Sequence, residues 1–400
     1  MGLSKRSIKA DFPIFNDSDL VYLDNASTTH KPQQVLDAIL SMYTETNANV
    51  HRALYDIGSQ ATERFENSRK RIADFIRASS EKEIIFTSGT TESINLLGRT
   101  LGNDLGPKDD ILVSEMEHHA NLVPWQMACD RTGANLKFIP INNKGELDLS
   151  EPDRYFTSST KIISIAHVSN VLGTINPIND IAEMAKDVGA IFIVDGAQGV
   201  PHQAVNVQEL GCDFYAFSGH KMLGPTGIGS LWGRMEILDR MDPFMGGGEM
   251  IDTVSMNSST WNEVPYKFEA GTPNFVQAVG LGAAIDYLES LGMDTIAKDE
   301  KEITDYALKK MSQIEGVRVF GAAKNRSGVI SFNLTGVHAH DLAQFLNKDN
   351  IAIRVGHHCA QPLLSSLNES SVARLSIYVY NDKSDIDKFC RSLITVKNYF

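Results

Sequence analysis

Short apolar runs alternate with helical stretches through most of this chain, from about Tyr22 to Leu291. Segments such as Ser93–Arg99 and Asp180–Asp187 have the spacing of helices. The apolar runs between the helices indicate buried strands at Glu83–Thr87, Asp110–Ser114, Lys161–His167, Ala190–Asp195 and Asp213–Phe217. Strands that are almost continuously apolar and separated by helices form a mainly parallel sheet with both faces covered. The sequence therefore predicts an α/β domain.

The pattern changes after a long helical stretch, from about Phe275 to Met311. The apolar runs that follow are Val317–Phe320, Gly328–Leu334, Ile351–Arg354 and Ala373–Tyr378. They predict an α+β domain with its own sheet, on which the first twenty or so residues pack. A chain of 400 residues is also too long for one small core. We expect a large domain of residues 20–292 and a small domain formed by residues 1–19 and 293–400.

The composition excludes several classes of function. The chain has 37 Lys and Arg against 50 Asp and Glu, a net charge of −13, and it has no basic tract, which argues against nucleic acid or an anionic membrane as partner. Its four cysteines form no CxxC pair, so we expect neither a metal site nor a disulfide framework. The N-terminus lacks the apolar core of a signal peptide, and no apolar run reaches the roughly 20 residues of a membrane span. We expect a cytoplasmic protein.

Lys221 lies between the apolar run Asp213–Phe217 and the glycine-rich segment Gly224–Gly229. An amine that is partly desolvated at a strand end has a pKa below the usual value of about 10.4, which makes its nucleophilic form accessible. Such an amine forms Schiff bases with carbonyl groups, including that of pyridoxal phosphate (PLP). A lysine beside glycines is more often a solvated loop residue. On its own, Lys221 leaves both interpretations open.

Two strand ends carry groups that suit the same ligand. The segment Thr87–Glu92 joins a strand to a helix, where free N–H groups and the helix dipole favour a phosphate. Simple capping of the helix by Ser or Thr is the alternative. Asp195 ends an apolar strand, and its carboxylate needs a cationic partner such as a protonated pyridine nitrogen. It could instead cap the following turn.

Three further segments could carry chemistry. One imidazole of the pair in Glu117–Asn121 could stack on an aromatic ring and move protons near neutral pH, or be structural. Cys359, among polar and imidazole-bearing neighbours in Arg354–Pro362, could become a thiolate; the alternative is a small buried hydrophobe. Arg374 lies on an apolar strand and suits a substrate carboxylate, or an internal salt bridge.

In their joint order these motifs closely resemble those of the fold-type I, class V aminotransferase-like PLP enzymes. More narrowly, the chain looks like a group II cysteine desulfurase of the SufS type. The resemblance extends from Tyr22–Thr29 through Asn49–Arg52 to the C-terminal region. Its marker is the short segment Arg354–Pro362, since group I enzymes place their cysteine in a longer, serine-rich loop. The resemblance implies a large domain with a mainly parallel seven-stranded sheet and a smaller α+β domain that carries the cysteine loop.

The resemblance implies PLP as cofactor and gives roles to particular residues. Lys221 would bind PLP as a Schiff base and transfer protons, and Cys359 would receive sulfur from the substrate. His119 would stack on the cofactor ring, Asp195 would pair with the ring nitrogen, and Gln198 would bind the ring hydroxyl. The other cofactor-binding positions implied are Thr90, Thr91, Ser218, His220 and Thr272 of the partner subunit. The substrate-binding positions implied are Arg374, Asn170, Arg354, Ala26 and His51.

The implied function is that of a PLP-dependent L-cysteine desulfurase. It would produce L-alanine and a persulfide on Cys359, and supply sulfur for iron–sulfur cluster assembly. A homodimer would pass this sulfur to an acceptor of the SufE or SufU type in the SUF machinery. One alternative is a selenocysteine lyase or cysteine sulfinate desulfinase. Another is a non-catalytic PLP-fold scaffold, which would have no physical need for the combination of Lys221, Asp195, His119 and Cys359.

Overall fold

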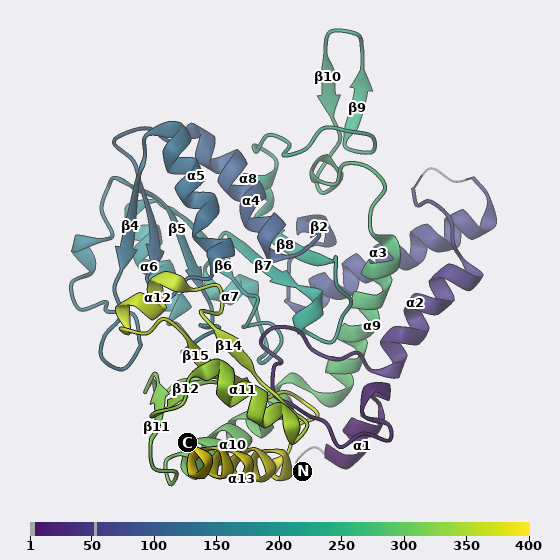
Figure 1. The fold of residues 1–400 in the computed structure, drawn as a ribbon. Coiled ribbons are helices and arrows are strands. Elements are labelled where there is room, and N and C mark those ends of the chain that lie inside the picture. Colours follow the sequence, from purple (N-terminus) through teal and green to yellow (C-terminus); the bar gives the residue numbers. More distant parts are fainter. Residues whose placement is uncertain (1–4, 52–53) are drawn as a thin grey trace.

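A computed structural model describes residues 5–51 and 54–400 (Figure 1). Residues 1–4 of the expected small domain, and Arg52 of the segment Asn49–Arg52, lie outside the described residues. A seven-stranded sheet forms the centre of the fold. In spatial order its strands are β2 (Ile84–Thr87), β8 (Gly229–Gly233), β7 (Phe214–Ser218), β6 (Ile191–Asp195), β5 (Thr160–Ala166), β3 (Asp110–Ser114) and β4 (Asn135–Ile139). The strands are parallel except β8, which runs antiparallel to both of its neighbours.

The expected mainly parallel seven-stranded sheet is confirmed, and all five strands predicted in this region are present. Two strands have no counterpart in the sequence prediction. Strand β4 lies at the edge of the sheet and is largely exposed, so it lacks a continuous apolar run. Strand β8 begins and ends with glycine, which resembles a loop in the sequence. A Cβ atom on Gly229 would lie 2.5 Å from the Cα of Gly89, the residue before α4, and 2.5 Å from the Phe217 carbonyl of β7, so this close backbone contact requires glycine.

Helices cover both faces of the sheet, which explains why its central strands are apolar throughout (Figure 1). On one face, α4 (Thr90–Thr100) and α5 (Val123–Thr132) pack on a core that includes Phe214 and Ala216. The opposite face, which includes Tyr215 and Phe217, belongs to a second core. Its helices are α2 (Gln33–Glu45), α3 (Asp56–Phe75), α6 (Ile178–Val188), α7 (Val207–Leu210) and α9 (Phe275–Leu291). Successive residues of a strand thus enter different cores.

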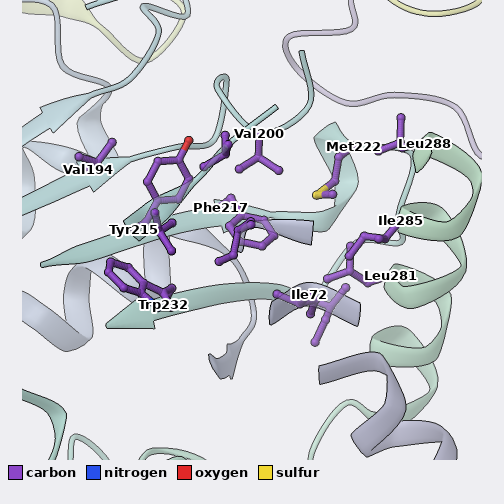
Figure 2. Close-up of a cluster of buried hydrophobic side chains, with 14 of the residues drawn as sticks. Ile72, Val194, Val200, Tyr215, Phe217, Met222, Trp232, Leu281, Ile285 and Leu288 are labelled. Atoms are coloured by element: carbon purple, nitrogen blue, oxygen red, sulfur yellow. The ribbon is translucent and has the colours of Figure 1, made fainter. Parts of the chain in front are cut away.

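Figure 2 shows how α3 and α9 bury their apolar sides against the centre of the sheet. Ile72 of α3 and Leu281 of α9 belong to the same buried cluster as Phe217 of β7 and Trp232 of β8. None of these four side chains is more than 1% exposed. This packing fixes β7, the strand that leads to Lys221.

The C-terminal region forms a four-stranded antiparallel sheet in the order β11 (Val317–Phe320), β12 (Val329–Leu334), β15 (Val372–Ser376) and β14 (Arg354–Gly356). The helices that pack on it are α10 (Met293–Met311), α11 (Ala339–Lys348) and α13 (Lys383–Tyr399). Helix α12 (Gln361–Ser366) instead places Leu363 and Leu364 in the core of the large sheet. The long helix expected over residues 275–311 is two helices, because Gly292 between them has a φ of 82°. The strand expected at residues 351–354 is also divided. Residues 351–352 form β13, which pairs with β1 (Val21–Tyr22), whereas β14 pairs with β15.

The N-terminal segment packs on the C-terminal region, as expected. Lys9 of α1 (Lys5–Ala10) forms an ion pair of 2.9 Å with Asp385 of α13. The ring of Phe12 contacts Tyr380 at a centroid distance of 4.8 Å, and it also contacts Tyr287 of α9 at 5.9 Å. This segment therefore touches both parts of the chain, and the domain boundaries stay a prediction.

Two smaller elements complete the fold. Helix α8 (Met235–Leu238) follows β8, and a hairpin of β9 (Ile251–Val254) and β10 (Ser259–Trp261) projects away from the body (Figure 1). Within residues 5–51 and 54–400, none of the helices has the length and apolar character needed to span a membrane.

Replacing Leu281 by alanine tests the packing of α9 on the sheet. The side chain is completely buried, so we expect Leu281→Ala to lower the free energy of unfolding by about 2–5 kcal/mol. Denaturant unfolding followed by circular dichroism measures the change. Met127→Ala is the matched control, because Met127 is 52% exposed and its loss leaves no internal cavity. A Leu281 variant as stable as this control would contradict the packing described.

Candidate active site

A cavity of about 470 Å³ lies beyond the carboxyl ends of the central strands, where β14, β15 and the loop after β14 also reach it. In a mainly parallel sheet this edge is the usual place for a ligand. The structure brings many of the predicted site residues together here. The cavity is lined by Lys221, Cys359, Asp195, Gln198, Thr90, Thr91, Ser218, His220, Arg374, Asn170, Arg354 and Ala26. His119, Thr272 and His51 are not among the lining residues.

Lys221 and Asp195 place opposite charges at the ends of adjacent strands. Lys221 ends the 3-10 turn that follows β7, and Asp195 is the last residue of β6. Desolvation in the cavity wall lowers the pKa of Lys221, and Asp195 opposes this shift. Desolvation raises the pKa of Asp195, whose Oδ1 accepts the Ala197 N–H at 2.9 Å. A lowered amine pKa makes the neutral, nucleophilic form of Lys221 accessible, as the sequence predicted.

The start of α4 and the end of β7 form a cradle for an anion. Thr90 begins α4, and its N–H donates to Ser218 Oγ at 2.9 Å. The hydroxyl groups of Thr90 and Ser218 share a hydrogen bond of 2.8 Å. Gly89, with a φ of 146°, lets the chain turn sharply into the helix. The helix dipole, free N–H groups and hydroxyls at this point suit a phosphate.

His220 lies between this cradle and Lys221 in the sequence. Its burial, together with the charges of Lys221 and Lys31, lowers the pKa of the imidazole to about 4. His220 is therefore neutral at physiological pH and can donate one hydrogen bond to an anion.

Gln198 has one satisfied and one unsatisfied polar atom. Its Nε2 donates to the Ala26 carbonyl at 2.7 Å, which connects the loop after β6 to the N-terminal segment. Its Oε1 is buried and has no hydrogen-bond partner among the described residues. A buried acceptor of this kind favours a ligand that brings a hydroxyl or N–H donor.

Arg374 on β15 is held by groups from other parts of the chain. One nitrogen, Nη1, donates to the Asn170 carbonyl at 2.9 Å, and Nη2 donates to Ser27 Oγ at 2.7 Å. Nη2 also contacts Asp24 Oδ1 at 3.3 Å, so the internal salt bridge considered as an alternative does exist. The Nε atom is buried and has no hydrogen-bond partner within the part of the chain that the structure describes. Arg374 therefore retains a donor for a further anion.

The two adjacent histidines take different positions, and the expectation for His119 placed the wrong imidazole in the cavity. His118 lines the cavity, and desolvation lowers its pKa to about 3, helped by the charge of Lys221. Its Nδ1 accepts the Ala120 N–H at 3.0 Å and so caps a 3-10 turn of residues 119–121. The side chain of His119 does not line the cavity; its Nε2 accepts the Gln361 N–H at 3.2 Å. The sequence alone does not show which of two adjacent side chains at a turn enters a cavity.

His51 and Thr272 also lie outside the cavity. His51 Nε2 is 2.8 Å from Glu66 Oε1, and its ring packs on Tyr266 at a centroid distance of 5.1 Å. Thr272 lines a separate hollow beside Ser88 and Glu92. The expectation that Thr272 acts on a partner subunit's cofactor stays a prediction, as does a substrate contact of His51.

Cys359 lies on a strained loop between β14 and α12. His358 and Cys359 have φ angles of 51° and 55°, in the left-handed region that non-glycine residues rarely adopt. Asn170 Nδ2 donates to the His358 carbonyl at 2.8 Å, and the His119 N–H donates to the Cys359 carbonyl at 2.7 Å. These bonds from the large sheet's loops hold the strained loop beside the cavity.

Glu117 is a buried carboxyl group that the sequence reading did not single out. It accepts hydrogen bonds from Ser114 Oγ at 2.5 Å, Asn121 Nδ2 at 2.6 Å and the Ala166 N–H at 3.0 Å. Burial raises its pKa to about 7, although these donors oppose the shift. The network fixes the segment that carries His118. The sequence contains one sign of this role, because Glu117 is a charged residue between an apolar strand and a pair of histidines.

Residues 21–389 match the family model described as aminotransferase class-V. The chain belongs to this family. The chain is similar to a probable cysteine desulfurase of Halalkalibacterium halodurans. The two are 49% identical over 403 residues, which cover 100% of this chain and 99% of the relative. A solved apo structure of cysteine desulfurase from Thermococcus onnurineus NA1 has a TM-score of 0.95 at 38% identity and covers 99% of this chain and 98% of that chain.

The solved structure of the cysteine desulfurase CsdA from Escherichia coli has a TM-score of 0.94 at 36% identity. The match covers 100% of this chain and 99% of that chain. The class V membership and the fold-type I architecture expected from the sequence are therefore confirmed.

Glu117→Gln tests the buried carboxyl through the pH dependence of stability. An unfolded glutamate releases its proton near its ordinary pKa of 4.5, whereas Glu117 retains its proton up to about 7. In this interval the folded state binds more protons, so a rise in pH lowers stability. From about pH 5 to pH 8 we expect the wild type to lose up to about 3 kcal/mol more than Glu117→Gln. Denaturant unfolding at both pH values measures the difference, and equal losses in the two proteins would contradict the raised pKa.

Proposed function

We propose that this protein is a PLP-dependent cysteine desulfurase. It converts L-cysteine to L-alanine and receives the sulfur on Cys359 as a persulfide. One observation carries the proposal: the amine of Lys221 and the thiol of Cys359, from different parts of the chain, line the same cavity. An amine of lowered pKa suits a carbonyl cofactor, and a cysteine suits a sulfur acceptor.

The residues of the cavity fit PLP. The unsatisfied Oε1 of Gln198 suits the ring hydroxyl, and the buried carboxylate of Asp195 suits a protonated ring nitrogen. The start of α4, with Thr90, Thr91, Ser218 and His220, suits the phosphate. When bound, PLP supplies an electron sink that stabilises negative charge beside the substrate's α-carbon. His118, which lines the cavity, would lie against the ring in place of His119.

Arg374 is proposed to bind the carboxylate of the substrate. Its guanidinium group is fixed by the Asn170 carbonyl and by Ser27, so its remaining donor has a defined direction. A planar guanidinium held in this way recognises a carboxylate with little loss of side-chain freedom. Arg354 also lines the cavity, and its side chain is 55% exposed. It supplies a second positive charge near the cavity entrance.

The chemical steps need two groups of this chain. Lys221, as a neutral amine, removes the proton from the α-carbon of the substrate. The Cys359 thiolate then attacks the substrate sulfur, and a sulfur–sulfur bond forms as the carbon–sulfur bond breaks. The electron pair of the broken bond stays on the β-carbon, which takes up a proton and becomes a methyl group. Lys221 then returns a proton to the α-carbon, which completes alanine. Cysteine and one enzyme thiol thus give alanine and one enzyme persulfide.

The biological setting belongs to the same proposal. The protein would act in the cytoplasm as a homodimer and pass its sulfur to a SufE- or SufU-type acceptor for iron–sulfur cluster assembly. Leu36, Leu40 and Tyr43 form an exposed apolar stripe on α2, which supports association. In a dimer, Thr272 would reach the partner's cavity, and His51 would contact the substrate. The small domain of residues 1–19 and 293–400 would carry Cys359 to the large domain of residues 20–292.

Two variants separate the roles of the lysine and the cysteine. Purified protein is incubated with L-cysteine and a thiol reductant, and alanine and sulfide are assayed. We expect Lys221→Ala to lose the visible absorbance of covalently held PLP and to lower turnover by about 100- to 10,000-fold. We expect Cys359→Ser to keep that absorbance but to release no sulfide above background, because its hydroxyl is a poor sulfur acceptor.

Cys129→Ser is the matched control, since Cys129 lies on α5 outside the cavity. Full cysteine turnover in Cys359→Ser would sink the proposed mechanism. Turnover of selenocysteine or cysteine sulfinate in wild type without turnover of cysteine would instead identify one of the two related lyase activities. Absence of any cofactor absorbance in wild type would favour a scaffold.

A further inference from the structure

The imidazole of His119 reaches from the large sheet's loops to the helix that follows Cys359. Its Nε2 atom accepts the N–H of Gln361 at 3.2 Å. Gln361 is the first residue of α12, two positions after Cys359. The contact thus joins the loop after β3 to the segment that carries the thiol.

Helix α12 has no capping side chain of its own. The N-cap position is Ala360, which lacks a side-chain oxygen, and no side-chain cap bond is formed there. Pro362 at the second position has no N–H group. The Gln361 N–H is therefore a first-turn donor that no side chain of α12 satisfies. His119 supplies an acceptor for it from the other part of the fold.

The cysteine loop is bound to the large sheet's loops at three successive points. Asn170 Nδ2 donates to the His358 carbonyl at 2.8 Å, and the His119 N–H donates to the Cys359 carbonyl at 2.7 Å. The imidazole of His119 provides the third contact, at Gln361. Because His358 and Cys359 both have positive φ angles, the loop needs such external bonds to keep its conformation.

An imidazole nitrogen accepts a hydrogen bond only when it carries no proton. Burial lowers the pKa of His119, and the neighbouring ring of His357, at a centroid distance of 5.7 Å, lowers it further. A neutral His119 with its proton on Nδ1 meets the requirement.

We propose that His119 is a positioning residue for Cys359. Its imidazole caps α12 from the loop after β3 and so sets the position of the Cys359 thiol. The inference rests on the proposed function for its kinetic consequence, but not for the contact itself. A thiol must lie within a narrow range of distance and direction to attack sulfur, and small displacements are costly. His119 therefore acts on turnover through Cys359, and does not act on the cofactor or on substrate binding by Arg374.

Three substitutions separate the acceptor atom from the ring. His119→Ala removes both, His119→Phe keeps a ring without an acceptor, and His119→Gln keeps an acceptor near the Nε2 position. Hydrogen–deuterium exchange of the full-length, PLP-loaded protein is followed in the peptide that spans residues 359–366. We expect about fivefold faster exchange in the Ala and Phe variants, and exchange close to wild type in the Gln variant. His340→Ala is the control, because His340 is exposed on α11 and should change nothing.

Kinetics give the second measurement. With L-cysteine we expect kcat to fall at least about fivefold in the Ala and Phe variants and to recover in the Gln variant, with KM and the cofactor absorbance unchanged. Unchanged exchange in His119→Ala would overturn the inference, and so would a loss of kcat that His119→Gln fails to restore. If wild type releases no sulfide from cysteine, the proposed function fails, while the exchange result still decides whether His119 holds the loop.

Discussion

The site depends on a cation and an anion buried at the ends of neighbouring strands. Asp195 lies beside Ala216 in the register of β6 and β7, and β7 continues directly into the turn that ends at Lys221. Desolvation disfavours the charge on each group, so each lowers the cost of the other. The two apolar cores, one on each face of the sheet, hold both strands in place. A cofactor with a protonated nitrogen for Asp195 and a carbonyl group for Lys221 matches this arrangement.

The remaining groups come from segments far apart in the chain. Arg374 and Cys359 belong to the C-terminal sheet and its loop, whereas Asn170 belongs to the loop after β5. Asn170 joins them, because its carbonyl accepts from Arg374 and its amide donates to His358. One side chain and its own backbone therefore hold both the group proposed to bind the substrate carboxylate and the loop proposed to accept sulfur.

The sequence predicted the parts of this site that strand ends determine. Apolar strands identified the edge of the sheet, and residues such as Asp195 and Lys221 follow from their position after those strands. It failed where the direction of a side chain depends on a turn. His118 and His119 are adjacent, and the hydrogen bonds from Ala120 to His118 and from Gln361 to His119 fix which ring enters the cavity. Strand β8 was missed for a related reason. Its glycines serve close backbone contact, which a propensity pattern interprets as a loop.

The reversed direction of β8 has a mechanical consequence. Gly229 at its start pairs with Thr87 on one side and with Ser218 on the other, so the anion cradle and the end of β7 are tied together through one residue. Lys221 consequently lies just after β7, in the connection between two interior strands, β7 and β8. The Gly219 N–H donates to the Ile228 carbonyl at 2.9 Å and the Met222 N–H donates to the Gly219 carbonyl at 3.0 Å, so backbone bonds fix the turn that carries Lys221. The reactive amine is thus placed before any ligand arrives, and little conformational entropy is lost on binding.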